Sequence, residues 1–396
     1  MSDPTDGLVA EIRSWIVGQG LQGGSLTELL QGFAERLSAG GLSLSRAYMA
    51  LPTISPEWRA INLTWRRGEN AVRETIEHDR FPNDFAGSPV QHLLESGKMR
   101  HRWRIAAEGG TEGYRLLEAL RQEGHTDYAA HIVAFGASAV FAVQGVALTA
   151  CSDAPEGFGN DDLALLNELV PVLALAAYRL ALFDMTVDVL GAYLGHDAGL
   201  RILNGETRRG KGESVPAALM MADLAGFTAA SETGGEGLIE RLGEHLAAMV
   251  EPVEREGGEV LKFLGDGILA AFPIDLSADP ELACVKALNA ACRAIAENDK
   301  VNRHHPDAPS LALKVGLHRG EVFYGNVGAG SRLDFTVIGP AVNEAARLET
   351  LCGTLGHAIL MSEPFARSCG RATVSLGRHR LRGVAELREI FALPAG

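Results

Sequence analysis

Cysteine and net positive charge are both scarce in this chain of 396 residues. Its five cysteines are scattered and lack C-x-x-C spacing, so we expect neither a disulfide framework nor a zinc site. Cysteines used in this way fit a reducing cytoplasm. The formal charge of −14 argues against a nucleic-acid binder or an anionic-membrane binder, because such surfaces need a basic stripe.

Long uninterrupted apolar runs are also rare. The N-terminus, MSDPTDGLVAEIRSW, is acidic and has no apolar core, so we expect no signal peptide. Residues 131–152 contain no Asp, Glu, Lys or Arg, and a stretch of about 20 residues could span a bilayer. Polar residues dilute this stretch, and its central Gly-Ala-Ser indicates a turn. We therefore predict two buried strands, and a soluble protein without a membrane segment.

The length exceeds what one hydrophobic core usually supports, which favours two domains. The first part has helical spacing over 8–40, strand-like segments over 44–66, short helices that end at glycines, and a long exit helix over 161–197. This order, with the loop GFGNDD at 157–162, resembles a GAF-type sensor domain. We predict a regulatory domain at 1–184 that could take a small-molecule ligand, followed by a helical connector at 185–214.

Strands and helices alternate from residue 215 onward. We predict a strand at 217–223, a helix at 237–256, a hairpin at 260–272, a helix at 279–298, a strand pair at 311–317 and 322–327 around Arg319-Gly320, a strand at 333–338 and a helix after Pro340. The whole chain is therefore expected to be α+β, with a ferredoxin-like βαββαβ palm inside a domain at 215–396.

Two carboxylates stand at the ends of predicted strands in this second domain. Asp223 follows the apolar run 217–222, and Asp266 occupies a Gly-Asp-Gly turn between 260–264 and 268–272. Two acids placed in this way suit paired divalent cations, which prefer oxygen ligands and clamp phosphates. Each acid alone could instead be structural, Asp223 as a helix N-cap and Asp266 in a type I′ hairpin turn.

These acids are followed by the segment DFTVIGPAVNEAAR at 334–347. The combination resembles the catalytic domain of the class III nucleotidyl cyclases, in the form of the class IIIb subgroup, and the connector at 190–213 resembles theirs. The resemblance implies that Asp223, Asp266 and the carbonyl of Leu224 hold two Mg²⁺ or Mn²⁺ ions per site. It also implies that ATP is cyclised to 3′,5′-cyclic AMP with release of pyrophosphate.

The resemblance assigns further residues to the triphosphate and the base. Backbone N–H groups of Gly226, Phe227 and Thr228 would bind the terminal phosphates at a helix start. Lys262 would donate to adenine N1, and the Thr336 hydroxyl would accept from the exocyclic amine. The alternative for these two is an exposed strand lysine and an ordinary β-branched strand residue.

Three more residues would contact the ribose and the phosphates. Asn343 and Arg347 are four residues apart and therefore share a helix face. By resemblance Asn343 orients the ribose, Arg347 stabilises charge on the α-phosphoryl group, and Arg382 contacts the terminal phosphates. Without that role, the first two would form a solvated helix face and Arg382 would be a surface arginine.

The resemblance also implies a homodimer with shared active sites. In this family the metal-binding acids come from one subunit, and the base-reading, asparagine and arginine groups come from the other. One chain contains a single complete set of both, so two chains would form two sites. The competing hypotheses are a guanylate cyclase and a catalytically silent cyclase-like module that binds nucleotide or mediates dimerisation.

Overall fold

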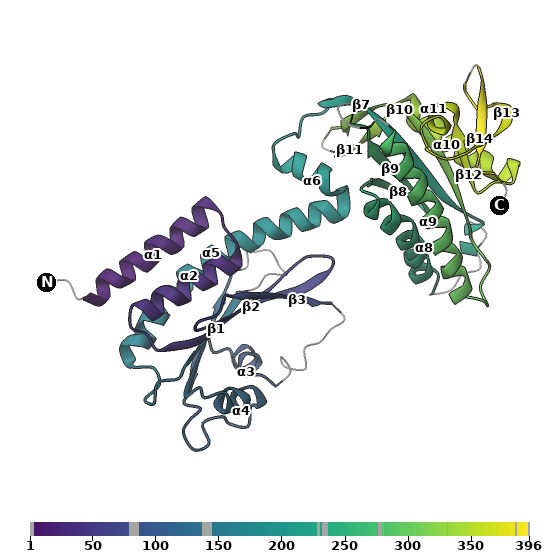
Figure 1. The fold of residues 1–396 in the computed structure, drawn as a ribbon. Helices are drawn as coiled ribbons and strands as arrows, with labels where there is room; N and C mark the ends of the chain where they lie inside the picture. The colour runs from purple at the N-terminus through teal and green to yellow at the C-terminus, as the bar shows by residue number, and fades with distance from the viewer. Residues whose placement is uncertain are drawn as a thin grey trace. The chain divides into compact units, whose positions relative to one another are not determined.

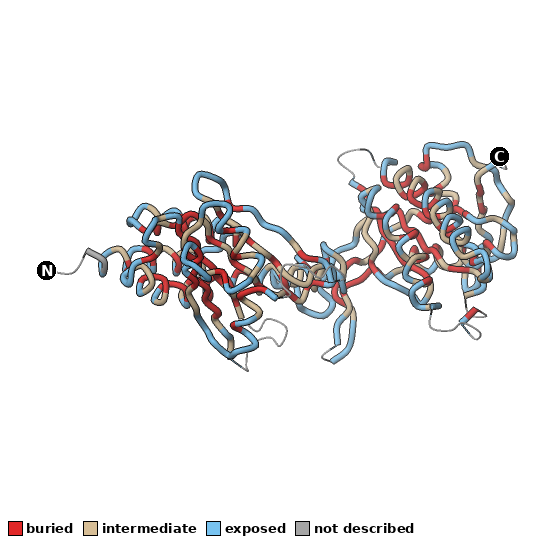
Figure 2. Tube along the Cα trace, turned by 90° about the horizontal axis from the view of Figure 1, so that it is seen from below, coloured by how far each residue is buried: buried red, intermediate tan, exposed pale blue. Residues whose placement is uncertain are grey.

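The computed structural model describes residues 4–78, 87–136, 145–227, 230–231, 237–275, 279, 281–330, 332–384 and 386–394. The chain divides into two compact units, Met1–Val189 and Leu190–Gly396. Each unit has its own sheet and its own buried residues (Figures 1 and 2). The mixed α+β class expected from the sequence is confirmed.

The first unit is a six-stranded antiparallel sheet in the order β3-β2-β1-β6-β5-β4. Helices α1, α2 and α5 pack on one face, and α3 and α4 contribute to the core on the other. The strands are β1 (Leu44–Pro52), β2 (Trp58–Arg66), β3 (Val72–Glu77), β4 (Arg100–Trp103), β5 (Asp127–Ala134) and β6 (Gly145–Ser152), and the helices are α1 (Pro4–Gln22), α2 (Leu26–Ala39), α3 (Pro89–Ser96), α4 (Arg115–Gln122) and α5 (Asn160–Leu194).

The uncharged stretch 131–152 contributes to two paired strands of this sheet, β5 and β6. Residues 137–144, which include part of the predicted turn, lie outside the described residues. Alternate residues of β6, among them Val146, Leu148 and Ala150, join the core beneath the helices. Both strands are largely buried, and this burial explains why the stretch contains no charged residue. The assignment of the unit to the GAF type stays a prediction.

Helix α5 has 35 residues and contains Pro171. By length and composition alone it could cross a membrane, but 44% of its most apolar window is buried in the protein, and a core helix of a soluble protein passes the same test. The predicted end at residue 197 is wrong by three residues. Gly195 has φ +94°, a left-handed conformation that interrupts the helix before α6 (His196–Leu203).

The second unit contains the β-α-β-β-α-β order expected for the palm, from β7 to β10. Its sheet has the order β13-β14-β12-β10-β7-β9-β8, and β11 pairs with β10. Helices α8 and α9 cover one face, while α6 and α10 contribute to the core on the other. The elements are β7 (Gly212–Ala225), α8 (Gly237–Arg255), β8 (Glu259–Leu264), β9 (Gly267–Pro273), α9 (Leu282–His304), β10 (Ala312–Ala329), β11 (Arg332–Ile338), α10 (Pro340–Leu355), β12 (Ile359–Ser362), α11 (Glu363–Ala366), β13 (Val374–Arg380) and β14 (Leu387–Ala392).

The predicted strand pair around Arg319-Gly320 is wrong. Strand β10 is continuous, and it pairs with β7 through Arg319↔Ala218 and Gly320↔Ala217 without a break. Gly320 serves close packing rather than a turn. A Cβ atom at this position would lie 2.8 Å from the Cβ of Ala341 in α10.

Candidate active site

The end of β7 and the hairpin between β8 and β9 bring Asp223 and Asp266 together. The β7–β9 ladder runs to Ala222↔Ile268, which places Gly267 beside Asp223. A Cβ atom on Gly267 would lie 2.4 Å from the Ala222 carbonyl oxygen and 2.8 Å from Asp223 Oδ1. Glycine at this position therefore lets the Asp266 loop approach the strand that carries Asp223.

The loop that carries Asp266 differs from the turn considered from the sequence. Gly265 and Asp266 are the two loop residues, since Leu264 pairs with Gly267. Gly265 has φ +71°, whereas Asp266 does not have a positive φ. Glycine at the first loop position matches a type II′ hairpin, in which Asp266 is not required for turn geometry. The type I′ alternative for Asp266 is therefore wrong.

The charges of the two acids repel each other. Burial raises the pKa of Asp223, the charge of Asp266 raises it further, and the ammonium of Lys314 opposes both effects. Among the described residues neither carboxylate accepts a hydrogen bond. A divalent cation would relieve this repulsion, so the donor set fits the metal expected for the site.

The remaining ligands would have to be backbone or substrate oxygens. No group of three or more His, Cys, Asp or Glu side chains suited to a metal ion occurs in the described part of the chain. The Leu224 side chain is buried in the core on the other face of the sheet, so only its carbonyl could serve. The β7–β9 pairing ends before Leu224, at Ala222.

Two charged residues at this site were missed from the sequence. Lys314 of β10 lies directly opposite Asp223 in the β7–β10 ladder. Glu349 of α10 has a pKa raised by burial and by the charge of Asp223, and lowered by Lys314. A lysine within the apolar run 311–317 was the available signal. The proximity of Glu349 had no signal in the sequence, because it depends on how α10 packs.

The predicted phosphate-binding turn follows β7 directly. Gly226 has φ +89°, and its carbonyl accepts from the N–H of Ala230 at 3.0 Å, as at the beginning of a helix. Phe227 is half-buried against the core of the unit. Thr228 lies outside the described residues. The described part of the turn is compatible with anion binding by backbone N–H groups.

Lys262 and Thr336 come from strands β8 and β11. Lys262 is exposed and forms an ion pair with Asp334, two residues before Thr336. Thr336 is 7% exposed, and its hydroxyl has no hydrogen-bond partner among the described residues. The structure thus brings the lysine to the strand that carries the threonine.

Asn343, Arg347 and Arg382 form a third group. Asn343 and Arg347 lie on α10, which begins after Gly339, and the Asn343 side chain is exposed. A Cβ atom on Gly383 would lie 3.3 Å from a terminal nitrogen of Arg347, so the turn that carries Arg382 packs beside this arginine. No ion pair joins Arg347 or Arg382 to Asp223 or Asp266 in the described part of one chain.

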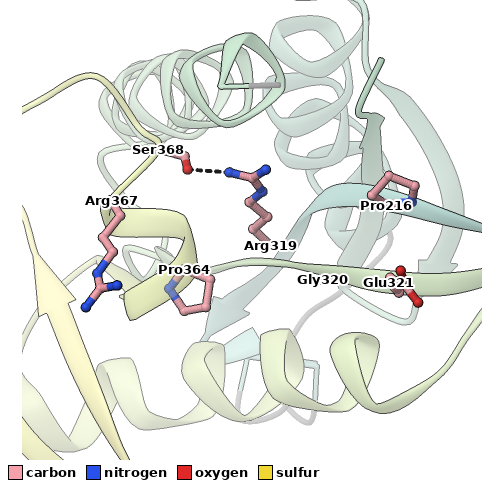
Figure 3. A pocket seen from close by; sticks show the side chains of 7 residues that line it. All are labelled: Pro216, Arg319, Gly320, Glu321, Pro364, Arg367 and Ser368. Carbon is pink, nitrogen blue, oxygen red and sulfur yellow. Dashed lines mark hydrogen bonds between the residues drawn. The ribbon is translucent and has the colours of Figure 1, made fainter. Parts of the chain in front are cut away.

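A pocket of about 360 Å³ lies elsewhere on the same unit (Figure 3). It is lined by Pro216, Arg319, Gly320, Glu321, Pro364, Arg367 and Ser368, and Arg319 donates to the Ser368 hydroxyl. Pro216 precedes Asp223 by seven residues on the same strand, which corresponds to about 23 Å at 3.3 Å per residue. None of the predicted site residues lines this pocket.

The second unit is thus an α+β domain in which two acids lie together at the end of a strand. The lysine, asparagine and arginine side chains of the predicted site are separate from these acids in the described part of one chain. The sequence profile of the adenylate and guanylate cyclase catalytic domain matches residues 211–386. This match supports the resemblance of residues 211–386 to the class III cyclase catalytic domain.

Individual relatives agree with this assignment. Adenylate cyclase 2 of Rhizobium meliloti (strain 1021) is 30% identical over 238 residues, which are 58% of this chain and 64% of that protein. The adenylate cyclase of Anabaena cylindrica is 34% identical over 151 residues, which are 38% of this chain and 30% of that protein. The chain therefore spans less than two thirds of the length of these curated relatives.

Similar solved structures cover about half of the chain. The crystal structure of the adenylyl cyclase CyaB from P. aeruginosa has 24% identity and a TM-score of 0.43, and covers 47% of this chain and 97% of that one. The crystal structure of the guanylyl cyclase Cya2 has 24% identity and a TM-score of 0.40, and covers 46% of this chain and 92% of that one.

Proposed function

We propose that this chain is an adenylate cyclase that converts ATP to 3′,5′-cyclic AMP and pyrophosphate. The ribose 3′-oxygen forms a bond to the α-phosphorus, the bond between that phosphorus and the leaving pyrophosphate oxygen breaks, and the 3′-hydroxyl proton passes to solvent. The observation that carries the proposal is the pair of acids, Asp223 and Asp266, held close together and without a hydrogen bond to either among the described residues.

The chain's own residues position the substrate and neutralise charge. Asp223, Asp266 and the Leu224 carbonyl would hold Mg²⁺ or Mn²⁺, which lowers the pKa of the 3′-hydroxyl and offsets charge on the leaving phosphates. Backbone N–H groups after Gly226 bind the terminal phosphates. Asn343 orients the ribose, and Arg347 stabilises the negative charge that develops on the α-phosphoryl group.

ATP is the proposed substrate because of the groups offered to the base. The Lys262 ammonium can donate to adenine N1, and the Thr336 hydroxyl is free to accept from the adenine amine. Guanine carries a hydrogen on N1 and a carbonyl in place of the amine, so the same pairing would fail. The name of the Rhizobium relative, an adenylate cyclase at 30% identity, supports the same choice.

Purified protein with Mn²⁺ and either ATP or GTP tests these proposals. We expect cyclic AMP from ATP and at least about tenfold less product from GTP, because a failed base pairing leaves polar groups unsatisfied. Activity confined to GTP would establish the guanylate cyclase alternative. No product from either nucleotide, with retained nucleotide binding, would establish the silent module.

The active unit is proposed to be a homodimer with two shared sites in the cytoplasm. In the described part of one chain no ion pair joins the acids to Arg347, as expected if they meet across an interface. Mixing Asp223→Ala and Arg347→Ala chains should create heterodimers in which one site carries both substitutions and the other carries neither. We expect about half of the wild-type activity per heterodimer; a purified heterodimer without activity would refute shared sites.

The first unit is proposed to regulate the second through the connector. Helix α6 packs on the catalytic sheet through Ala198, and Asp197 accepts a hydrogen bond from the Tyr324 hydroxyl at 3.0 Å. Removal of residues 1–189 should therefore change the rate without changing nucleotide preference. An unchanged rate in a folded truncation would count against this coupling.

A further inference from the structure

The ion pair between Lys262 and Asp334 joins two distant segments beside the proposed base site. Lys262 lies on β8, Asp334 lies on β11, and the two residues are 72 apart in sequence. Both side chains are partly exposed, at 44% and 43%. An exposed ion pair of this kind contributes little to the stability of the fold. Its position next to Thr336 suggests a different use.

Strand β11 fixes where Asp334 points. Residues two apart on a strand face the same side, so Asp334 and Thr336 share a face. The alternate residues Phe335 and Val337 are buried in the core, and Phe335 meets Tyr324 edge-on with ring centroids 4.9 Å apart. Core packing therefore fixes one face of the strand, while the opposite face carries the Thr336 hydroxyl and the Asp334 carboxylate, which pairs with Lys262.

Lysine needs such an anchor more than most residues do. Its ammonium stands on a flexible four-carbon chain that adopts many rotamers when it is free. The ammonium has three N–H donors, so one can bond Asp334 while others remain for a base. The Thr336 hydroxyl can donate as well as accept, so it discriminates weakly between adenine and guanine on its own. Discrimination then depends on where the ammonium is held.

We propose that Asp334 is a positioning residue that holds the Lys262 ammonium against the purine and thereby sets the preference for adenine. This inference rests on the proposed function, because it assigns Asp334 to the same nucleotide site. Without the carboxylate, the ammonium samples several positions in water. Adenine then binds less well, and guanine is no longer disfavoured to the same degree.

Steady-state kinetics of the full-length protein with Mn²⁺ test the proposal. Asp334→Asn should raise the KM for ATP about three- to tenfold with little change in kcat, and should lower the ATP-to-GTP preference by a similar factor. Asp334→Glu should restore part of both. Glu297→Gln, which removes another exposed carboxylate–lysine pair on α9, should leave both unchanged.

A double-mutant cycle shows whether Asp334 acts through Lys262. Lys262→Met should weaken ATP use more than Asp334→Asn does. In the Lys262→Met background the second substitution should have almost no further effect, because the group that it positions is absent. Additive losses would overturn the proposal, as would a lower kcat with an unchanged KM in Asp334→Asn.

Binding of non-cyclising nucleotides separates this inference from the proposed function. 3′-Deoxy-ATP and 3′-deoxy-GTP lack the attacking oxygen, so calorimetry with them measures base preference without turnover. A protein that makes no cyclic AMP but loses its preference for 3′-deoxy-ATP on Asp334→Asn would support the inference and refute the cyclase activity. A protein that makes cyclic AMP and keeps its preference for 3′-deoxy-ATP in Asp334→Asn would support the cyclase activity and refute the inference.

Discussion

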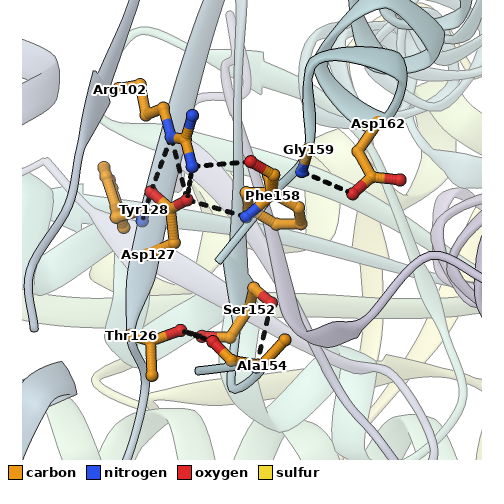
Figure 4. Close-up of polar contacts among 9 residues, drawn as sticks. All are labelled: Arg102, Thr126, Asp127, Tyr128, Ser152, Ala154, Phe158, Gly159 and Asp162. Carbon is orange, nitrogen blue, oxygen red and sulfur yellow. Dashed lines mark hydrogen bonds and ion pairs between the residues drawn. The ribbon is translucent and has the colours of Figure 1, made fainter. Parts of the chain in front are cut away.

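Asp127 of the first unit and Asp223 of the second both lie in strands, but Asp127 is fully buried and Asp223 is only partly buried. Asp127 is fully buried and accepts hydrogen bonds from the guanidinium of Arg102 and the N–H groups of Tyr128 and Phe158 (Figure 4). Arg102 also donates to the Phe158 carbonyl. Asp223 accepts no hydrogen bond from the residues that the structure describes, and it faces a second carboxylate.

The contrast separates a charge that stabilises the fold from a charge that is available for function. The bonds to Asp127 tie β4, β5 and the loop before α5 together, and Gly157 is required there because a Cβ atom would lie 2.3 Å from Asp127 Oδ2. Asp223 instead faces a second carboxylate, and the ammonium of Lys314 only partly offsets the rise in its pKa. Carboxylates that repel each other in this way are expected where a bound cation supplies the compensating positive charge.

The largest expected effect is the loss of activity in Asp223→Asn. Removal of a cation-binding carboxylate should lower kcat by at least about 10²–10³-fold, measured as cyclic AMP formation with Mn²⁺. The thermal midpoint without cation should stay equal or rise, because a repulsive charge is removed. The control is Asp307→Asn, an exposed aspartate of the same unit. A large drop in stability would show that Asp223, like Asp127, stabilises the fold.

Asp127→Asn should lower the stability of the first unit and leave the nucleotide preference of the enzyme unchanged. The change leaves the Arg102 guanidinium without its counter-charge, which costs about 3–5 kcal/mol for a buried pair. All four tryptophans, Trp15, Trp58, Trp65 and Trp103, belong to the first unit, so tryptophan fluorescence during denaturation reports that unit alone. We expect a lower denaturation midpoint with unchanged ATP-over-GTP preference. An unchanged midpoint would contradict the structural role.

The difference between the two aspartates explains what the sequence could predict. Asp223 and Asp266 stand in short local patterns, an apolar run and a Gly-Asp-Gly loop, so their placement followed from neighbouring residues. Asp334 lay in a recognised segment, but its contact with Lys262 requires two strands to meet across 72 residues. Asp127 and Arg102 have no local pattern, and nothing in the sequence marked them as a pair.

The same limit explains the errors in the fold. The alternation of strands and helices followed from periodicity, which is a local property. Gly320 was read as a turn because glycine often marks one, yet its φ is not positive and its neighbour across space is Ala341. The sequence alone does not distinguish a glycine that allows close packing from a glycine that forms a turn. Only the tertiary structure separates them.

A smaller effect is expected when the acids are kept but moved. Gly267→Ala places a Cβ atom within 2.8 Å of Asp223 Oδ1 and 2.4 Å of the Ala222 carbonyl, so the hairpin or the carboxylate must shift. Because a displacement of about 1 Å can cost 10²-fold in rate, we expect a loss of about 10- to 100-fold in kcat. Gly243→Ala in α8 meets no atom within 4 Å and should keep full activity. Equal activity in both variants would show that the acids need not be adjacent.

The pH dependence gives the smallest and most specific test. Burial and Asp266 raise the pKa of Asp223, so protons compete with the cation above the ordinary range of an aspartate, which is about 3.9. Activity should therefore fall as the pH drops through this raised pKa. A tenfold increase in Mn²⁺ should move that acidic limb down by up to about one pH unit.

Stability without cation should change in the opposite direction. A carboxyl whose pKa is raised in the folded state binds a proton before the unfolded chain does, so the folded state gains stability as the pH falls from above the raised pKa toward the ordinary value. Circular dichroism melting should show this gain in the wild type and a smaller gain in Asp223→Asn. If the two proteins gave the same slope, or if the acidic limb ignored the Mn²⁺ concentration, the carboxylate would be neutralised within the fold, as Asp127 is, and would not be free to bind a cation.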